Sequence, residues 1–131
     1  TEHVLSTIKA FEERTGVHIA EYALYPDTDS VHWRLIVFIE TDAAIPESLE
    51  KDISRIFDEE LSKVNEEHGR MLKIGETSPS VVCRVNNGTF ASLRQMRINN
   101  GANSNQIKTV RVIYDPEQLT FLKDSADTVY H

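Results

Sequence analysis

The stretch Leu35-Ile36-Val37-Phe38-Ile39 decides the fold that this sequence predicts. It lies within residues 31–40 and is apolar on both faces, which is typical of a strand in the middle of a sheet. Residues 17–25 alternate as a strand does, and Pro26-Asp27-Thr28-Asp29-Ser30 between the two has the composition of a turn. A link of about five residues makes these two strands an antiparallel hairpin.

Helical spacing and turn residues outside the hairpin predict the other elements. Pro46 opens the longest predicted helix, and Asp115-Pro116-Glu117 is a strong helix start. These elements are helices at residues 1–15, 46–67, 89–98 and from 116 onward, and strands at 81–85 and 107–114. Residues 125–131 are expected to be frayed.

The predicted fold is α+β, in the order α-β-β-α-β-α-β-α, with a mixed sheet of about four strands and helices packed on it. A chain of 131 residues, 40% hydrophobic and 27% charged, fits one globular domain, residues 1–131. It starts without Met and with a helix at once, which indicates a piece of a longer protein. No apolar stretch approaches the ~20 residues that span a bilayer, and no signal peptide is recognisable. We therefore expect no membrane partner and a cytoplasmic location.

Several kinds of site have no support in the residues. The five histidines are scattered, so no metal site is expected. The sequence lacks both common phosphate-binding glycine motifs, so the chain supplies no recognised nucleotide cradle of its own. The hairpin aromatics lie among acidic residues, and no nucleic-acid partner is expected. Cys83, the only cysteine, lies in an apolar run and is expected to be a buried apolar residue, not a reactive thiol.

The charges are unevenly distributed along the chain. The formal net charge is −7, yet residues 77–114 contain no Asp or Glu. The five cations of this segment are Arg84, Arg94, Arg97, Lys108 and Arg111. Lys108 stands where the polar loop Gly101-Ala102-Asn103-Ser104-Asn105-Gln106 becomes the predicted strand, so a rigid element could hold a cation within reach of a ligand. Either these cations form one face for an anionic ligand, or they pair with acidic residues from elsewhere in the fold.

Two groups of residues resemble a known family. Gly88-Thr89-Phe90, Leu93, Gly101-Ala102 and Asn105-Gln106-x-Lys108-Thr109-x-Arg111 are similar to the carboxy-terminal domain of the auxin-responsive acyl-acid amido synthetases, within the acyl-adenylate-forming superfamily. Upstream, Glu21-Tyr22-x-x-Tyr25-x-Asp27 resembles the same family more weakly. The resemblance covers nearly the whole chain. Ile107 and Val110 stand where plant members usually have an aromatic residue and proline, which favours a bacterial relative over a plant hormone enzyme.

The resemblance implies a two-step ligase. A carboxylic acid reacts with ATP to give an acyl-adenylate and pyrophosphate, and an amine, often an amino acid, then attacks to give an amide. The chain would be the small mobile domain, and its partner would be its own N-terminal adenylation domain, which binds most of the ATP and Mg together with the acid. Lys108 falls on the position of the adenylation lysine, and Gln106 and Arg111 would either help to bind ATP or brace the loop. The isolated domain is expected to be inactive.

Two other functions stay open from the residues alone. One is a stand-alone module that binds a small anion through Arg94, Arg97, Lys108 and Arg111, and the other is an oligomerisation domain. Glu21, Tyr22 and Tyr25 either form a second face for a reoriented domain or, in the case of the tyrosines, pack in or over the sheet.

Overall fold

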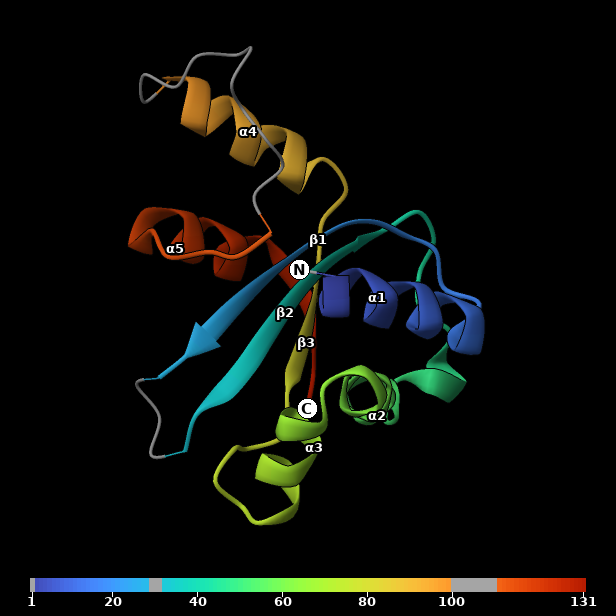
Figure 1. Cartoon of the computed structure of the whole chain (residues 1–131). Coiled ribbons are helices and arrows are strands. Elements are labelled where there is room, and N and C mark those ends of the chain that lie inside the picture. The colour runs from blue at the N-terminus through green and yellow to red at the C-terminus, as the bar shows by residue number, and fades with distance from the viewer. Residues whose placement is uncertain (1, 29–31, 100–110) are drawn as a thin grey trace.

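A computed structural model describes residues 2–28, 32–99 and 111–131 of the chain (Figure 1). Its helices are α1 Glu2–Thr15, α2 Ile53–Val64, α3 Glu66–Lys73, α4 Thr89–Asn99 and α5 Pro116–Ser125, with a short 3-10 helix η1 at Glu47–Leu49. Its strands are β1 Ile19–Asp27, β2 Arg34–Thr41, β3 Val81–Val85 and β4 Ala126–Tyr130. No helix in these ranges is long and apolar enough to cross a bilayer.

The strands form one mixed sheet in the order β1-β2-β3-β4. The predicted hairpin is present, because β1 and β2 pair antiparallel with Leu24 opposite Val37. β2 pairs parallel with β3, and β3 pairs antiparallel with β4. The α+β fold with a mixed sheet of four strands is confirmed.

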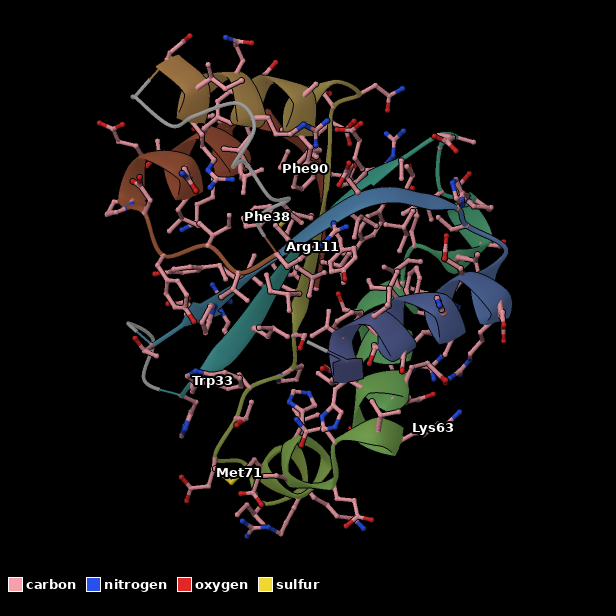
Figure 2. All side chains as sticks on the ribbon, turned by 45° about the horizontal axis from the view of Figure 1, so that its top comes forward. Trp33, Phe38, Lys63, Met71, Phe90 and Arg111 are labelled. Carbon is pink, nitrogen blue, oxygen red and sulfur yellow. The ribbon has the colours of Figure 1, made fainter. Side chains whose placement is uncertain are left out.

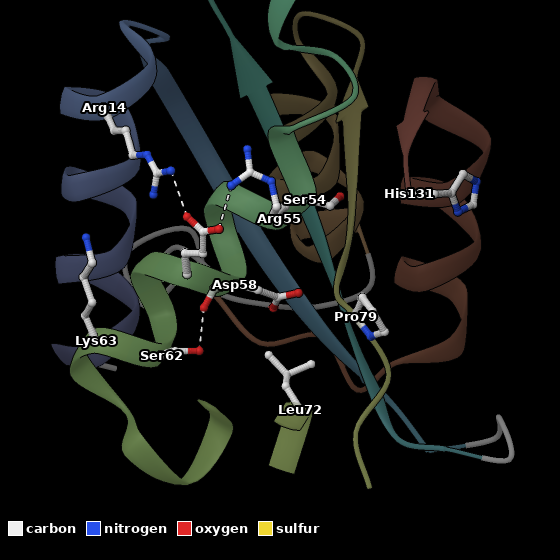
Figure 3. A pocket seen from close by; sticks show the side chains of 10 residues that line it. Arg14, Ser54, Arg55, Asp58, Ser62, Lys63, Leu72, Pro79 and His131 are labelled. Atoms are coloured by element: carbon white, nitrogen blue, oxygen red, sulfur yellow. Dashed lines mark hydrogen bonds and ion pairs between the residues drawn. The ribbon is translucent and has the colours of Figure 1, made fainter. Parts of the chain in front are cut away.

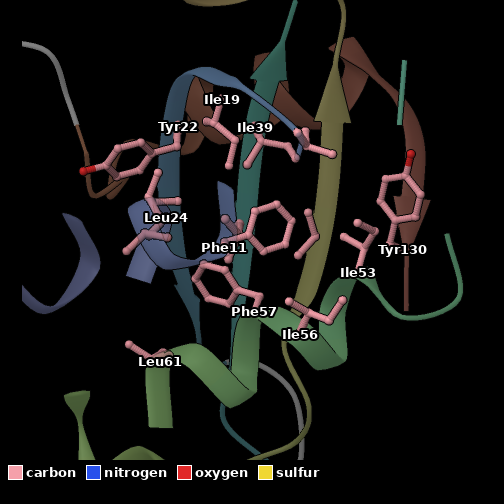
Figure 4. Packing of buried hydrophobic residues seen from close by; sticks show 14 of the residues in the cluster. Phe11, Ile19, Tyr22, Leu24, Ile39, Ile53, Ile56, Phe57, Leu61 and Tyr130 are labelled. Carbon is pink, nitrogen blue, oxygen red and sulfur yellow. The ribbon is translucent and has the colours of Figure 1, made fainter. Parts of the chain in front are cut away.

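Two separate hydrophobic cores lie on the two faces of the sheet. The central stretch of β2 supplies both, because Leu35, Val37 and Ile39 face one core while Ile36 and Phe38 face the other. α1 and α2 pack on the first face, where Phe11 and Phe57 meet edge to face with ring centroids 6.5 Å apart (Figure 4). α4 and α5 cover the opposite face (Figure 1). The apolar run that predicted a central strand is thus buried on both sides.

The long helix predicted at residues 46–67 is divided into three elements, which corrects the sequence-based expectation. Asn65 interrupts it with an extended backbone, at φ −135 and ψ 91, and its side chain accepts a hydrogen bond from the His68 N–H at 3.2 Å. Asparagine is a favoured residue at this capping position. Gly69, expected to end the helix, lies inside α3, where an added Cβ would come within 3.1 Å of Ser62 Cβ. The interruption lets α3 fold back against α2.

The fourth strand that the structure describes is β4, which lies after α5 and not before it. Residues 107–110 of the predicted strand lie outside the described residues, and of the following residues only Val112 makes an isolated parallel bridge, to Leu24. The segment expected to be frayed instead contains β4. Tyr130 anchors it, because its side chain is buried in the α1/α2 core and its carbonyl accepts a hydrogen bond from the Ser54 hydroxyl.

Candidate functional site

Of the three site residues predicted from the sequence, only Arg111 can be placed. Lys108 and Gln106 lie outside the described residues, and Arg111 is the first residue described after them. Arg111 lies beside β1 (Figure 2). Its contacts therefore define the part of the predicted site that the structure describes.

The Arg111 guanidinium is held by two consecutive residues of β1. Its Nη1 lies 3.3 Å from Glu21 Oε2 and donates a hydrogen bond to the Tyr22 carbonyl at 3.1 Å. The guanidinium carbon also lies 4.1 Å from the centroid of the Tyr22 ring, close enough for a cation–π interaction. These contacts join the two sequence groups that carry the family resemblance.

The backbone after Arg111 is fixed to the same strand. The Leu24 N–H donates to the Arg111 carbonyl at 2.6 Å, and the Ile113 N–H donates to the Leu24 carbonyl at 2.8 Å. Ile113 is fully buried in the α4/α5 core. The chain that follows residues 100–110 is therefore anchored at the outer edge of β1.

Glu21 connects Arg111 to helix α4. Its other carboxylate oxygen, Oε1, lies 3.2 Å from Arg94 Nη1. We refer to Glu21, Arg94 and Arg111 as the Glu21 bridge. α4 is itself held on the sheet by buried Phe90, whose N–H donates to Glu40 Oε1 at 3.1 Å at the start of the helix, where a carboxylate is favourable.

The cations of residues 77–114 are paired with acids from other parts of the fold wherever the structure shows an ion pair. Arg84 Nη1 lies 3.0 Å from Asp127 on β4, while Arg94 and Arg111 share Glu21. These three arginines therefore pair with acidic residues from elsewhere in the fold, which was one of the two interpretations of the charge pattern. The same segment therefore gains neighbours of opposite charge from β1 and β4.

Both tyrosines of the hairpin pack on the sheet, as one of the two interpretations expected. Tyr22 is buried in the α1/α2 core. Tyr25 is partly buried against the α4/α5 core, and the Lys123 ammonium lies 6.0 Å from its ring centroid. Each ring thus has a cation of the same domain beside it, Arg111 at Tyr22 and Lys123 at Tyr25.

A separate groove of about 750 Å³ lies between α1, α2 and the segment before β3 (Figure 3). Glu59 closes one side, with its carboxylate 2.8 Å from Arg14 and 2.6 Å from Arg55. Sequence analysis did not find this groove, because the charged face of α2 has the pattern of a solvated surface. Arg111, the one predicted site residue that the structure describes, does not line it.

Asp58, His68 and Ser80 form a buried polar network that the sequence also did not reveal. His68 Nε2 lies 2.9 Å from Asp58 Oδ1, the Ser80 N–H donates to Asp58 Oδ2 at 2.8 Å, and the Ser80 hydroxyl donates to Oδ1. Because the serine and the histidine both bind the carboxylate and not each other, this is not a nucleophile–base pair. The network instead joins α2, α3 and the start of β3.

The thiol of Cys83 is buried in the α4/α5 core, and burial raises its pKa. Its position agrees with the expected role as a buried apolar residue. Among the described residues there is no cluster of three or more His, Cys, Asp or Glu that could hold a metal ion.

Comparison with known proteins places the chain in a family. Residues 2–117 match the GH3 family C-terminal domain. The structure is similar to that of a GH3.15 acyl acid amido synthetase, with a TM-score of 0.80 and 15% sequence identity. It is equally similar to the AtGH3.15 acyl acid amido synthetase in complex with 2,4-DB, with a TM-score of 0.80 and 16% identity.

Both similarities cover 98% of this chain but only 24% and 23% of the two synthetase chains. The chain thus spans about a quarter of the length of these enzymes. No curated protein matches the sequence significantly.

Proposed function

The chain belongs to the GH3 family C-terminal domains, and on this basis we propose that it is the mobile C-terminal domain of an ATP-dependent acyl-acid amido synthetase. The reaction joins a carboxylic acid to an amine or amino acid through an acyl-adenylate, with release of pyrophosphate. The observation that carries the proposal is the family match over residues 2–117, which includes the segment of Lys108. ATP as a substrate favours a cytoplasmic location.

Lys108 is the residue to which we assign the contribution to adenylation. Negative charge accumulates on the α-phosphate oxygens and on the attacking carboxylate, and a lysine ammonium is a compact charge that can bind both. The N-terminal domain of the full synthetase would hold ATP, Mg and the acid, and this chain would bring the lysine to them. Gln106 and Arg111 would help beside it, either by binding ATP or by holding the loop that carries the lysine.

The test is Lys108→Ala in the full synthetase that contains this chain, measured by acid-dependent ATP–pyrophosphate exchange. We expect the rate to fall by about 10² or more, because a contact made in the transition state is typically worth a few kcal/mol. Lys9→Ala, at an exposed position on α1, is the matched control and should leave the rate unchanged. The isolated chain should show no exchange.

Full exchange activity in Lys108→Ala would refute the assignment of the lysine. If the isolated chain catalysed ATP–pyrophosphate exchange, the proposal that the N-terminal domain binds ATP and the acid would be refuted. A measurable affinity of the isolated chain for pyrophosphate, together with unchanged activity of Lys108→Ala, would favour an anion-binding module instead.

A further inference from the structure

Glu21 binds two arginines that lie far from it in the sequence. Its two carboxylate oxygens bind arginines that are 73 and 90 residues away in sequence. One arginine lies on α4, which ends before residue 100, and the other is the first residue after residue 110. A single carboxylate on β1 therefore binds one arginine on the helix before residues 100–110 and one just after them.

The charges indicate that the Glu21 carboxylate orients the side chains of Arg94 and Arg111 more than it stabilises the fold. The side chains of Glu21, Arg94 and Arg111 are 23%, 40% and 38% exposed, and an ion pair this exposed contributes little on its own. A guanidinium, however, stays protonated at any relevant pH. Without the carboxylate, two positive side chains would face each other at one place, and at least one would turn away.

Arg111 has several partners within its own domain. The Tyr22 ring covers one face of its guanidinium, while Glu21 and the Tyr22 carbonyl both accept from Nη1. The adjoining backbone is tied to Leu24 by two hydrogen bonds. A side chain with this many partners within its own domain is held in place as part of the scaffold.

We propose that Glu21 is a positioning residue, which orients Arg94 and Arg111 and thereby fixes the chain at the point where it meets β1 after residues 100–110. Arg111 is then a brace within the domain and not a contact to ATP. The kinetic consequence rests on the proposed function, in which Lys108 acts in adenylation. The structural consequence, a tighter junction between residues 111–113 and β1, does not depend on it.

The kinetic test uses the full synthetase and ATP–pyrophosphate exchange. Glu21→Gln keeps the shape of the side chain but removes its charge, and we expect kcat to fall about tenfold while KM for ATP stays within about twofold. Glu21→Asp keeps the charge and should recover most of the activity. Arg111→Gln should resemble Glu21→Gln, and the double variant should be no worse than the worse single variant, since the two residues act as one unit.

Asp127→Asn provides the matched control, because Asp127 also pairs with an arginine, at 3.0 Å from Arg84, but on β4. It should leave exchange activity unchanged. A rise of tenfold or more in KM for ATP in Arg111→Gln alone would show that Arg111 contacts ATP, and multiplicative losses in the double variant would show that the two residues act separately. Either result would overturn the proposal.

The structural test measures amide hydrogen exchange at Leu24 and Ile113, whose N–H groups make the two backbone hydrogen bonds at the junction. Glu21→Gln should speed exchange at both amides by about fivefold or more through local opening, and Asp127→Asn should not. Unchanged amide exchange rates in Glu21→Gln would refute the positioning role of Glu21. This measurement decides the role of Glu21 even if Lys108→Ala proves fully active and the proposed function fails.

Discussion

Asp58 is a carboxylate buried at the junction of α2, α3 and β3. It accepts hydrogen bonds from His68 and from both the N–H and the hydroxyl of Ser80, and all three residues are buried. Asp58→Ala would leave these partners buried and unsatisfied, and we expect a loss of about 3 kcal/mol or more in the free energy of unfolding. Urea denaturation measures it.

The matched control for Asp58→Ala is Asp124→Ala on the exposed surface of α5, where the loss should stay below about 0.5 kcal/mol. Equal losses in the two variants would show that the buried network adds nothing to stability. The network also explains how a histidine can lie buried inside this domain, because Asp58 gives its ring a polar partner.

Strand β4 tests whether the last residues of the chain are part of the fold. Tyr130 and Val129 are neighbours on opposite faces of the strand, the first 5% and the second 47% exposed. Tyr130→Ala should cost about 3 kcal/mol, because it empties a buried position in the α1/α2 core, whereas Val129→Ala should cost less than about 1 kcal/mol. Thermal denaturation of the two variants provides the comparison, and similar small shifts in both would mean that the segment is frayed.

The strands and helices differ in how well the sequence predicts them, for a physical reason. β2 was predicted from its own residues, because a strand buried on both faces needs a continuous apolar run. β4 has the mixed composition of Ala126-Asp127-Thr128-Val129-Tyr130, and it is a strand because β3 offers a partner edge and the core accepts Tyr130. Pairing of this kind depends on contacts far apart in sequence. A local pattern does not contain that information.

The break between α2 and α3 shows the same limit on a smaller scale. The apolar stripe runs to Val64 and no glycine or proline follows until Gly69, so local pattern alone favours one helix through Asn65. What separates the two helices is a tertiary contact, since His68 reaches Asp58 only if the chain turns at Asn65. Asn65 as a cap was a local signal that sequence analysis did not use.

The sequence also predicts only part of the candidate site. Lys108 was assigned from spaced residues that resemble a family, and that assignment stays a prediction because the residue lies outside the described part of the chain. The sequence indicated Glu21 as part of a second motif and as one residue of a possible second face. Its pairing with Arg94 and Arg111 joins residues up to 90 positions apart, so no pattern in either motif could have revealed it.

The ion pairs of Glu60 on α2, one to Lys63 in the same helix and one to Arg14 on α1, give the stability of the fold a dependence on pH. The Lys63 ammonium, 2.8 Å from Glu60, and Arg14, 3.0 Å away, lower the pKa of this buried carboxyl below its ordinary value of 4.5. A carboxyl whose pKa is lower in the folded state stabilises the fold above its unfolded pKa and loses that contribution as pH falls through the folded pKa. We therefore expect the free energy of unfolding to decrease as the pH falls below about 5.

Denaturant titrations across this pH range, with and without Glu60→Gln, measure the contribution of Glu60. The variant should show a shallower decrease, and Lys63→Met should act in the same direction because it removes the first partner. Identical slopes in all three proteins would show that Glu60 does not couple stability to pH.

The two hydrogen bonds between Leu24 and residues 111–113 have a consequence for self-association. β1 is the first strand of the sheet, and an outer strand with free N–H and C=O groups is a template on which a second chain can add a strand. At Leu24 both groups are already bonded within the molecule. Residues 111–113 thus also cover part of this edge, so we expect that opening of the junction would expose backbone groups of β1 to pairing with a second chain.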